Sequence, residues 1–237
     1  MTKTAQVKLS GGKKLRSVKE KLDSTKIYSL ADAIKFLQDN KFVKFDETLE
    51  VALRLGIDIE RSDQNVRGVV QLPNGTGKKI RVAAFVNDRD IDAAKKAGAD
   101  IVGLEDLIDE IKKENIQFDV CVATPDVMAK VSAVAKVLGP KGLMPNPKLG
   151  TVGPNIAEII KQVKAGQIEF CSDKAGVLHA GVGKLSFTLN ALEDNIRALV
   201  SAVIRSKPSG AKTPYILSAF VASTMGPSLK IETSSFK

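Results

Sequence analysis

The stretch "KIRVAAFVNDRDIDAAKKAGADIVGLEDLIDEIKKE", residues 79–114, decides the fold class of this chain of 237 residues. It alternates short apolar runs, typical of buried strands, with stretches that have helical spacing. The apolar run 118–124 continues the alternation, and Thr124 followed by Pro125 is typical of a further helix start. Strands that alternate with helices form a parallel sheet covered on both faces. The sequence therefore predicts a Rossmann-like unit over roughly residues 68–159.

The segments on either side of this unit follow an α+β pattern. Ser29, with Asp32 at capping-box distance, predicts the start of a helix. Residues 48–55 alternate polar and apolar side chains, which indicates a half-buried strand. Further along, we expect a hairpin that turns at 174–176, a long helix at 190–205, and then two last strands separated by a turn.

The two patterns together predict a two-domain α/β protein. We expect an α+β terminal domain built from both chain ends, residues 1–67 and 154–237, with a Rossmann-like α/β domain, residues 68–153, inserted into it. The chain would then cross twice between the domains, which allows hinge motion.

Charge is distributed unevenly along the chain, whose formal net charge is +9. Residues 1–22 carry seven Lys and Arg against one Glu, and residues 127–156 carry four Lys and no acid. Residues 88–119, in contrast, carry ten acids and five bases. An oriented field of this kind favours a polyanionic partner such as nucleic acid. The alternative is a basic surface that only meets solvent.

Neither a membrane nor an oxidising compartment is expected. No apolar stretch approaches the ~18 residues that span a bilayer, and the N-terminus lacks the apolar core of a secretion signal. Cys121 and Cys171 do not form a CxxC pair and lie in apolar runs. The expected location is therefore the reducing cytoplasm.

The sequence does not favour catalysis. The predicted strand that ends near Val86 is followed by no GxGxxG, and "NGTGKK" (74–79) lacks the spacing of a P-loop. His179 is the only histidine, so a catalytic triad or a metal cluster is not expected, and a structural or RNA-contacting role is the better interpretation. We predict no enzyme activity, no cofactor and no metal site.

Two stretches suit RNA. Lys44 and Phe45 precede the strand whose polar side carries Thr48 and Glu50. A lysine neutralises phosphate, an aromatic ring stacks, and hydroxyls reach the ribose 2′-OH. The turn "STMGPS" (223–228) offers hydroxyls beside a glycine, which permits close approach of a ligand. Taken singly, each stretch is better interpreted as an ordinary strand or turn.

Five longer stretches resemble one protein family. They are "RSDQNVRGVVQLPNGTGKK" (61–79), "VATPDVM" (122–128), "KVLGPKGLMPNPKLGTVG" (136–153), "IEFCSDKAGVLHAGVGK" (168–184) and "STMGPS" (223–228). In this order they are similar to the ribosomal protein L-one family of the bacterial large subunit, and the resemblance covers about residues 25–232. The proline-rich and lysine-rich stretch 136–153 resembles the signature loop of that family.

The resemblance implies the residues that contact RNA. The rRNA-binding set that it implies is Lys44, Phe45, Thr48, Glu50, Asp173, Lys174, Ser218, Thr224, Met225 and Gly226. Secondary RNA contacts are assigned to Lys136, Lys141, Lys148 and Lys184.

The resemblance also implies the partners. They are large-subunit ribosomal RNA, exit-site tRNA and the leader of the protein's own mRNA, with no membrane and a monomeric free protein. The implied function is to form the mobile stalk near the tRNA exit site, to assist release of deacylated tRNA and to repress translation of its own mRNA. Two alternatives remain, a free-standing RNA-binding regulator and a Rossmann-type enzyme.

Overall fold

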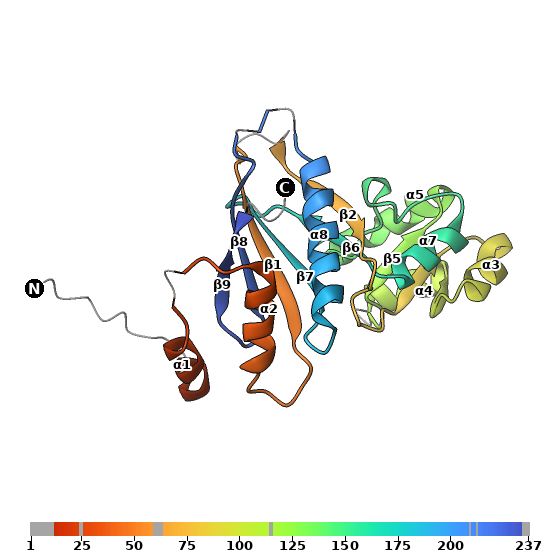
Figure 1. Cartoon of the computed structure of the whole chain (residues 1–237). Helices are drawn as coiled ribbons and strands as arrows, with labels where there is room; N and C mark the ends of the chain where they lie inside the picture. Colours follow the sequence, from red (N-terminus) through yellow and green to blue (C-terminus); the bar gives the residue numbers. More distant parts are fainter. Residues whose placement is uncertain are drawn as a thin grey trace, which may run out of the picture. The chain divides into compact units, whose positions relative to one another are not determined.

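A computed structural model describes residues 12–23, 26–58, 64–113, 116–208, 210–211 and 213–233. The chain forms two compact units (Figure 1). Unit 1 combines the residues up to Arg67 with those from Phe170 onward, and unit 2 comprises Gly68–Glu169. None of the helices in the described part of the chain is long and apolar enough to cross a bilayer.

Unit 1 is a four-stranded antiparallel sheet with helices on one face (Figure 1). The strand order is β7-β1-β8-β9, so β1, from near the chain start, lies in the middle. Helix α8 packs over β7, and α2 packs beside it over β8 and β9. The elements are α1 (Lys13–Glu20), α2 (Leu30–Asp39), β1 (Thr48–Leu55), β7 (Val177–Lys184), α8 (Leu189–Arg205), β8 (Ile216–Ser223) and β9 (Ser228–Ile231).

Capping and apolar spacing account for the two covering helices. The Asp32 backbone N–H donates to Ser29 Oγ (3.2 Å), and the Ser29 hydroxyl donates to the Asp32 carboxylate (2.8 Å), so the predicted helix start is confirmed. Thr188 caps α8 in the same way, accepting from the Ala191 N–H. Both helices bury one apolar stripe against the sheet, formed by Leu30, Ala33, Ile34 and Leu37 in α2 and by Leu192, Ile196, Leu199, Val200 and Val203 in α8.

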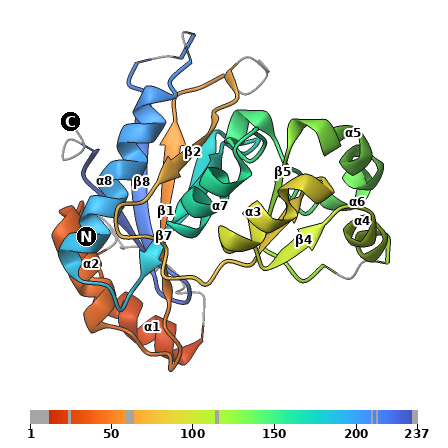
Figure 2. The same ribbon diagram turned by 90° about the vertical axis from the view of Figure 1, so that its right-hand side faces the viewer.

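Unit 2 is a parallel sheet with helices on both faces, as the alternation predicts (Figure 2). Its strand order is β4-β3-β5, and every residue of the central strand β3 is buried. One face packs on α3 and α7, and the other packs on α4 and on a run of short helical turns. The elements are β3 (Val82–Phe85), η2 (Asp88–Asp90), α3 (Ile91–Lys96), β4 (Ile101–Gly103), α4 (Glu105–Lys112), β5 (Val120–Ala123), η3 (Pro125–Val127), α5 (Met128–Val131), η4 (Ser132–Val134), α6 (Ala135–Leu138), η5 (Pro147–Leu149) and α7 (Ile156–Lys164).

The second crossing between the units lies later in the chain than the expected position near Gly153. Unit 2 continues to Glu169 because α7 belongs to its core. Ile156 and Ile160 of this helix are buried against Val82 and Val122 of the parallel sheet.

The expected hairpin around residues 174–176 forms only at its turn. Strand β6 (Gln167–Cys171) pairs with β2 (Arg67–Gln71), whereas β7 pairs with β1. A single bridge between Ser172 and Leu178 is what remains of the ladder between β6 and β7. The chain therefore passes from unit 1 to unit 2 within β2 and returns to unit 1 within β6. The sequence analysis did not identify β2.

Thr124 stands at the N-cap position of η3, but its side chain accepts no capping hydrogen bond. Its hydroxyl is buried and has no hydrogen-bond partner, and the segment after it breaks into 3-10 and α turns instead of one helix. The backbone N–H of Thr124 instead donates to the Phe85 carbonyl (3.2 Å), which ties this position to the sheet.

Candidate nucleic-acid interface

The sheet of unit 1 has one face that α2 and α8 leave uncovered, which we call the open face. Strand registers define it, because directly paired residues project to the same side. Alternate residues of β1, including Leu49 and Val51, are buried toward the helices, so the residues between them project outward. The outward residues are Thr48, Glu50, Ala52 and Arg54 of β1, Val177, His179, Gly181 and Lys184 of β7, Ser218, Phe220 and Ala222 of β8, and Ser228 and Lys230 of β9.

At one end of the open face, residues from opposite ends of the chain are joined. The Thr48 N–H donates to Thr224 Oγ1 (3.0 Å), and the Thr224 N–H and hydroxyl both donate to the Thr48 carbonyl (3.1 and 3.3 Å). The Lys184 ammonium donates to Thr48 Oγ1 (3.1 Å) and to the Asp46 carbonyl (3.2 Å). Thr48 Oγ1 therefore accepts from lysine, and its hydroxyl hydrogen can still donate to a further acceptor.

The turn that follows β8 is held in one shape by buried groups. The Met225 N–H donates to the carboxylate of Glu47 (3.0 Å), a side chain only 1% exposed. The Gly226 N–H donates to Ser223 Oγ (3.1 Å), and a Cβ on Gly226 would collide with that oxygen. Ser223 is buried, so it holds the turn and is not displayed with it. Glycine at 226 is thus required by the protein's own packing, while the Met225 side chain is 50% exposed.

Lys44 and Phe45 lie in the loop before β1, next to this turn-bearing end. Both are exposed, and the exposed fraction of Phe45 is 50%. The loop is anchored at Asp46, whose carboxylate accepts from the Ser186 N–H (3.2 Å) and hydroxyl (2.7 Å). An apolar ring is therefore presented to solvent on an anchored loop.

Asp173 and Lys174 lie at the other end of the open face, in the exposed turn before β7. The Asp173 carboxylate accepts from the N–H groups of Val177 and Ala175, both at 2.8 Å. These hydrogen bonds, that from Val177 first, hold the pKa of Asp173 below its usual value. Asp173 thus shapes the turn as an ionised carboxylate, and Ser218 lies near this end because it pairs with Arg54.

Lys136, Lys141 and Lys148 belong to unit 2 and are exposed. The loop that carries Lys148 is rigid because its hydrogen bonds converge on Asn146. The Asn146 N–H donates to Thr151 Oγ1 (2.8 Å), and Asn146 Oδ1 accepts from the Lys148 N–H (2.9 Å). Gly150 follows in the left-handed region, at φ +65°. The signature loop therefore holds a defined shape and displays positive charge, but on a different unit from the open face.

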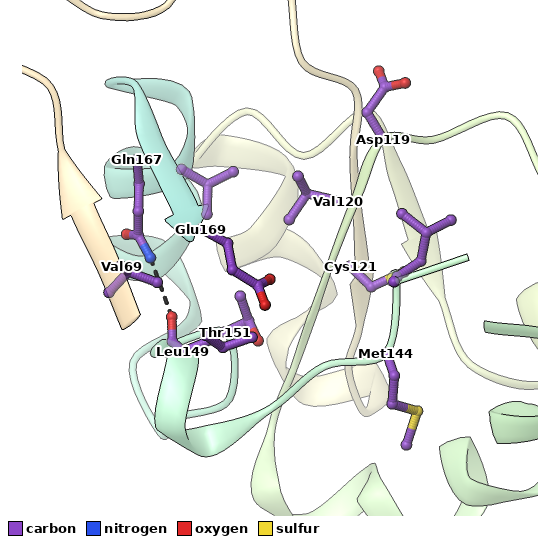
Figure 3. A pocket seen from close by; sticks show the side chains of 12 residues that line it. Val69, Asp119, Val120, Cys121, Met144, Leu149, Thr151, Gln167 and Glu169 are labelled. Atoms are coloured by element: carbon purple, nitrogen blue, oxygen red, sulfur yellow. Dashed lines mark hydrogen bonds between the residues drawn. The ribbon is translucent and has the colours of Figure 1, made fainter. Parts of the chain in front are cut away.

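A small, largely apolar pocket of about 220 Å³ lies between this loop and β5 (Figure 3). Met144 and Leu149 line it from the loop side, where Gln167 Nε2 donates to the Leu149 carbonyl (3.2 Å). Cys121 lines it from β5, and burial raises the pKa of this thiol to about 12. Because the thiolate is the reactive form, Cys121 is a packing residue and not a nucleophile.

A wider depression of about 820 Å³ lies where β3, β4 and β5 end, the usual ligand position in an open α/β sheet. Basic side chains, Arg89 and Lys130, line it together with several carboxylates, which stand at the helix starts. Asp106 and Asp126 stand in the first turns of α4 and η3, and Glu105 pairs with Lys130 at 3.1 Å. Negative charge at these helix starts opposes the binding of a phosphate, so the site does not support the nucleotide enzyme.

Four residues of the open face are absent from the predicted RNA-binding set. Arg54, His179 and Lys230 are exposed there, and Phe220 is half-buried between them. Arg54 continues the same alternation as Thr48 and Glu50, so that pattern could have identified it. The sequence predicted a structural or RNA-contacting role for His179, but its place on this face, like the places of Phe220 and Lys230, required the strand registers.

The fold and the surface together define a class of protein. One sheet face, belonging to an antiparallel sheet, displays hydroxyl and cationic side chains, and the other unit is a parallel sheet covered by helices on both faces. The chain is thus a two-unit α/β protein with one uncovered sheet face.

The comparisons with known proteins specify the family. The profile described as "Ribosomal protein L1p/L10e family" matches residues 37–227, and the chain belongs to that family. It is 52% identical over 233 residues to the "Large ribosomal subunit protein uL1" of Rickettsia rickettsii (strain Sheila Smith), a match that covers 98% of each chain. It is 51% identical over 233 residues to the protein of the same name from Rickettsia canadensis (strain McKiel), again with 98% of each chain covered.

Family membership confirms the predicted resemblance and excludes the enzyme alternative, because the relatives are named as ribosomal proteins. It also agrees with the expected cytoplasmic, ribosome-associated location.

Proposed function

We propose that this protein is a structural component of the large ribosomal subunit and binds its rRNA through the open face of unit 1. The observation that carries the proposal is the junction of Thr48 and Thr224. Two chain segments far apart in sequence meet there and present hydroxyls and cations on a face that the helices leave uncovered. The preformed turn at 223–226 adds Met225, and the anchored loop adds Phe45.

The shape of the open face favours folded RNA over single strands. The middle of its floor is made of the small residues Ala52, Gly181 and Ala222. Proteins that bind single strands stack bases on exposed aromatic rings, and the one Phe, Tyr or Trp ring among the outward residues named above, Phe220, is half-buried. The shallow groove of an RNA helix displays 2′-hydroxyls, which suit the hydroxyls of Thr48 and Ser218.

Unit 2 would act as a lever on the mobile stalk near the tRNA exit site. Only β2 and β6 carry the chain between the units, and a pair of short connections is suited to hinge motion. We propose that this motion assists release of deacylated tRNA. Lys136, Lys141 and Lys148, exposed on unit 2, would give it secondary contacts to RNA.

The same open face would also bind the leader of the protein's own mRNA and repress its translation. A face that recognises RNA by groove shape and 2′-hydroxyls can bind two different RNAs. An mRNA leader that folds like the rRNA site would present the same groove and the same 2′-hydroxyls to it. The free protein would do this as a monomer.

Sedimentation with ribosomal subunits tests the proposal. The protein should co-sediment with large subunits, and not with small ones, at moderate salt, and it should bind large-subunit rRNA more tightly than an unrelated RNA of equal length. A protein that stays in the supernatant while still binding its own mRNA leader would instead be a free-standing regulator.

A further inference from the structure

A row of side chains crosses the open face away from the Thr48 end. The registers pair His179 with Ala52, Ala52 with Phe220, and Phe220 with Lys230, so one line runs from β7 to β9. Arg54 projects two residues further along β1 than Ala52. Adjacent strands lie about 4.8 Å apart and residues about 3.3 Å apart along a strand. His179 and Lys230 are therefore roughly 14 Å apart, and Arg54 lies about 20 Å from Thr48.

Three basic side chains of this region are available for a partner. Arg54, His179 and Lys230 are exposed, and none forms a side-chain hydrogen bond or ion pair with another described residue. This differs from Lys184, whose ammonium is held by Thr48 and Asp46. Basic side chains that the protein does not use for its own structure can each take a phosphate without losing an internal contact.

Glu50 divides the open face into two zones. It is exposed, and it lies between the row of His179 and the end that carries Thr48. A carboxylate repels a phosphate backbone, so phosphates are excluded from the middle of the face and sugar or base donors are favoured there. The cationic zone beyond Glu50 is the part suited to the backbone itself.

We propose that Arg54, His179 and Lys230 bind phosphates of the RNA held by the open face, with the half-buried ring of Phe220 packed under the sugars between them. This inference rests on the proposed function of the same face.

Charged groups of both signs surround His179. They are Glu50 and Arg54 on β1 and Asp173 in the turn before its own strand. The imidazole ring carries an N–H that can donate to a phosphate oxygen.

The test uses the full chain and in vitro transcribed bacterial large-subunit rRNA in filter binding. The variants are Arg54→Gln, His179→Gln and Lys230→Gln. The matched control is Lys35→Gln, since Lys35 is exposed in the same unit on helix α2. Arg54→Gln and Lys230→Gln should each reduce the log–log salt slope by about 0.7–0.9 and weaken binding roughly threefold to tenfold at low salt. Arg54→Lys should retain the slope.

His179→Gln isolates the contribution of the imidazole. It should weaken rRNA binding about threefold relative to Lys35→Gln, because an imidazole N–H donor is replaced by an amide of different reach. The inference is overturned if wild-type protein binds the rRNA while the three Gln variants match Lys35→Gln in salt slope and affinity. Failure of the wild-type protein to bind the rRNA would overturn the proposed function instead. Circular dichroism checks that each variant is folded.

Discussion

Replacing Glu47 by alanine should weaken RNA binding although the Glu47 side chain cannot touch RNA. It is 1% exposed, and its carboxylate accepts the N–H of Met225 at 3.0 Å, so it acts only by positioning the turn 223–226. Without that acceptor the Met225 N–H loses its partner, and Met225 loses the fixed position from which it would contact RNA. Glu47→Gln keeps an oxygen acceptor of similar size and is the matched control.

The structure sets the size of the effect on stability. A hydrogen bond to a charged group contributes about 1.5–3 kcal/mol. Deleting the buried side chain also leaves a gap in well-packed surroundings, so the free energy of unfolding should fall by roughly 2–4 kcal/mol. In a protein of this length, that lowers Tm by roughly 5–15 °C. Glu47→Gln should lose about 1 kcal/mol or less, because a neutral acceptor replaces a charged one.

The assay has two parts, thermal unfolding by circular dichroism and rRNA binding at a temperature where all variants are folded. We expect Glu47→Ala to bind about tenfold more weakly with an unchanged salt slope, since no phosphate contact is lost, and Glu47→Gln to bind almost as the wild type does. A folded Glu47→Ala protein with full affinity would refute the idea that the preformed turn contributes to RNA binding.

Three further predictions concern single groups. Thr224→Val should reduce rRNA affinity about tenfold, roughly 1.4 kcal/mol. The salt slope should not change, because the substitution removes a hydroxyl and no charge. Unchanged affinity in a binding titration would contradict the assignment of Thr224 to the RNA-binding site. Lys44→Ala should instead lower the slope by about 0.7–0.9, and a slope equal to that of the wild type would remove Lys44 from the phosphate contacts. Cys171, which is exposed, should react with a thiol reagent at pH 8 well before Cys121, whose pKa burial raises to about 12; equal labelling rates by mass spectrometry would contradict the buried position of Cys121.

The helices and strands were predictable where the signal is local. The Ser29 cap and the alternation of 48–55 each depend on residues a few positions apart, and both are present as expected. The expected hairpin at 174–176 was only half correct, because the turn residues are local but the choice of partner for β6 is not. Nothing within Gln167–Cys171 indicates that its partner is β2, which lies about a hundred residues earlier.

The candidate site was predictable only in part, for the same reason. Thr48 and Thr224 were selected from the family resemblance, whereas their mutual hydrogen bonds emerge only when β1 and β8 are paired. Glu47 was missed because a single acidic residue before a strand gives no sign that it will be buried and bonded to Met225. His179, Phe220 and Lys230 lie on three different strands, and only the registers put them in one line.

By itself the sequence determined the class of fold, the basic character of the surface and the family, because periodicity, charge and long motifs are properties of neighbouring residues. Only the tertiary structure decided where unit 2 ends, which strands pair and which side chains share the open face. These outcomes follow from the free energy gained when α7 is buried against the sheet of unit 2 and when segments from both ends of the chain pair in the sheet of unit 1. These contacts join residues that lie far apart in sequence, so no local sequence pattern predicts them.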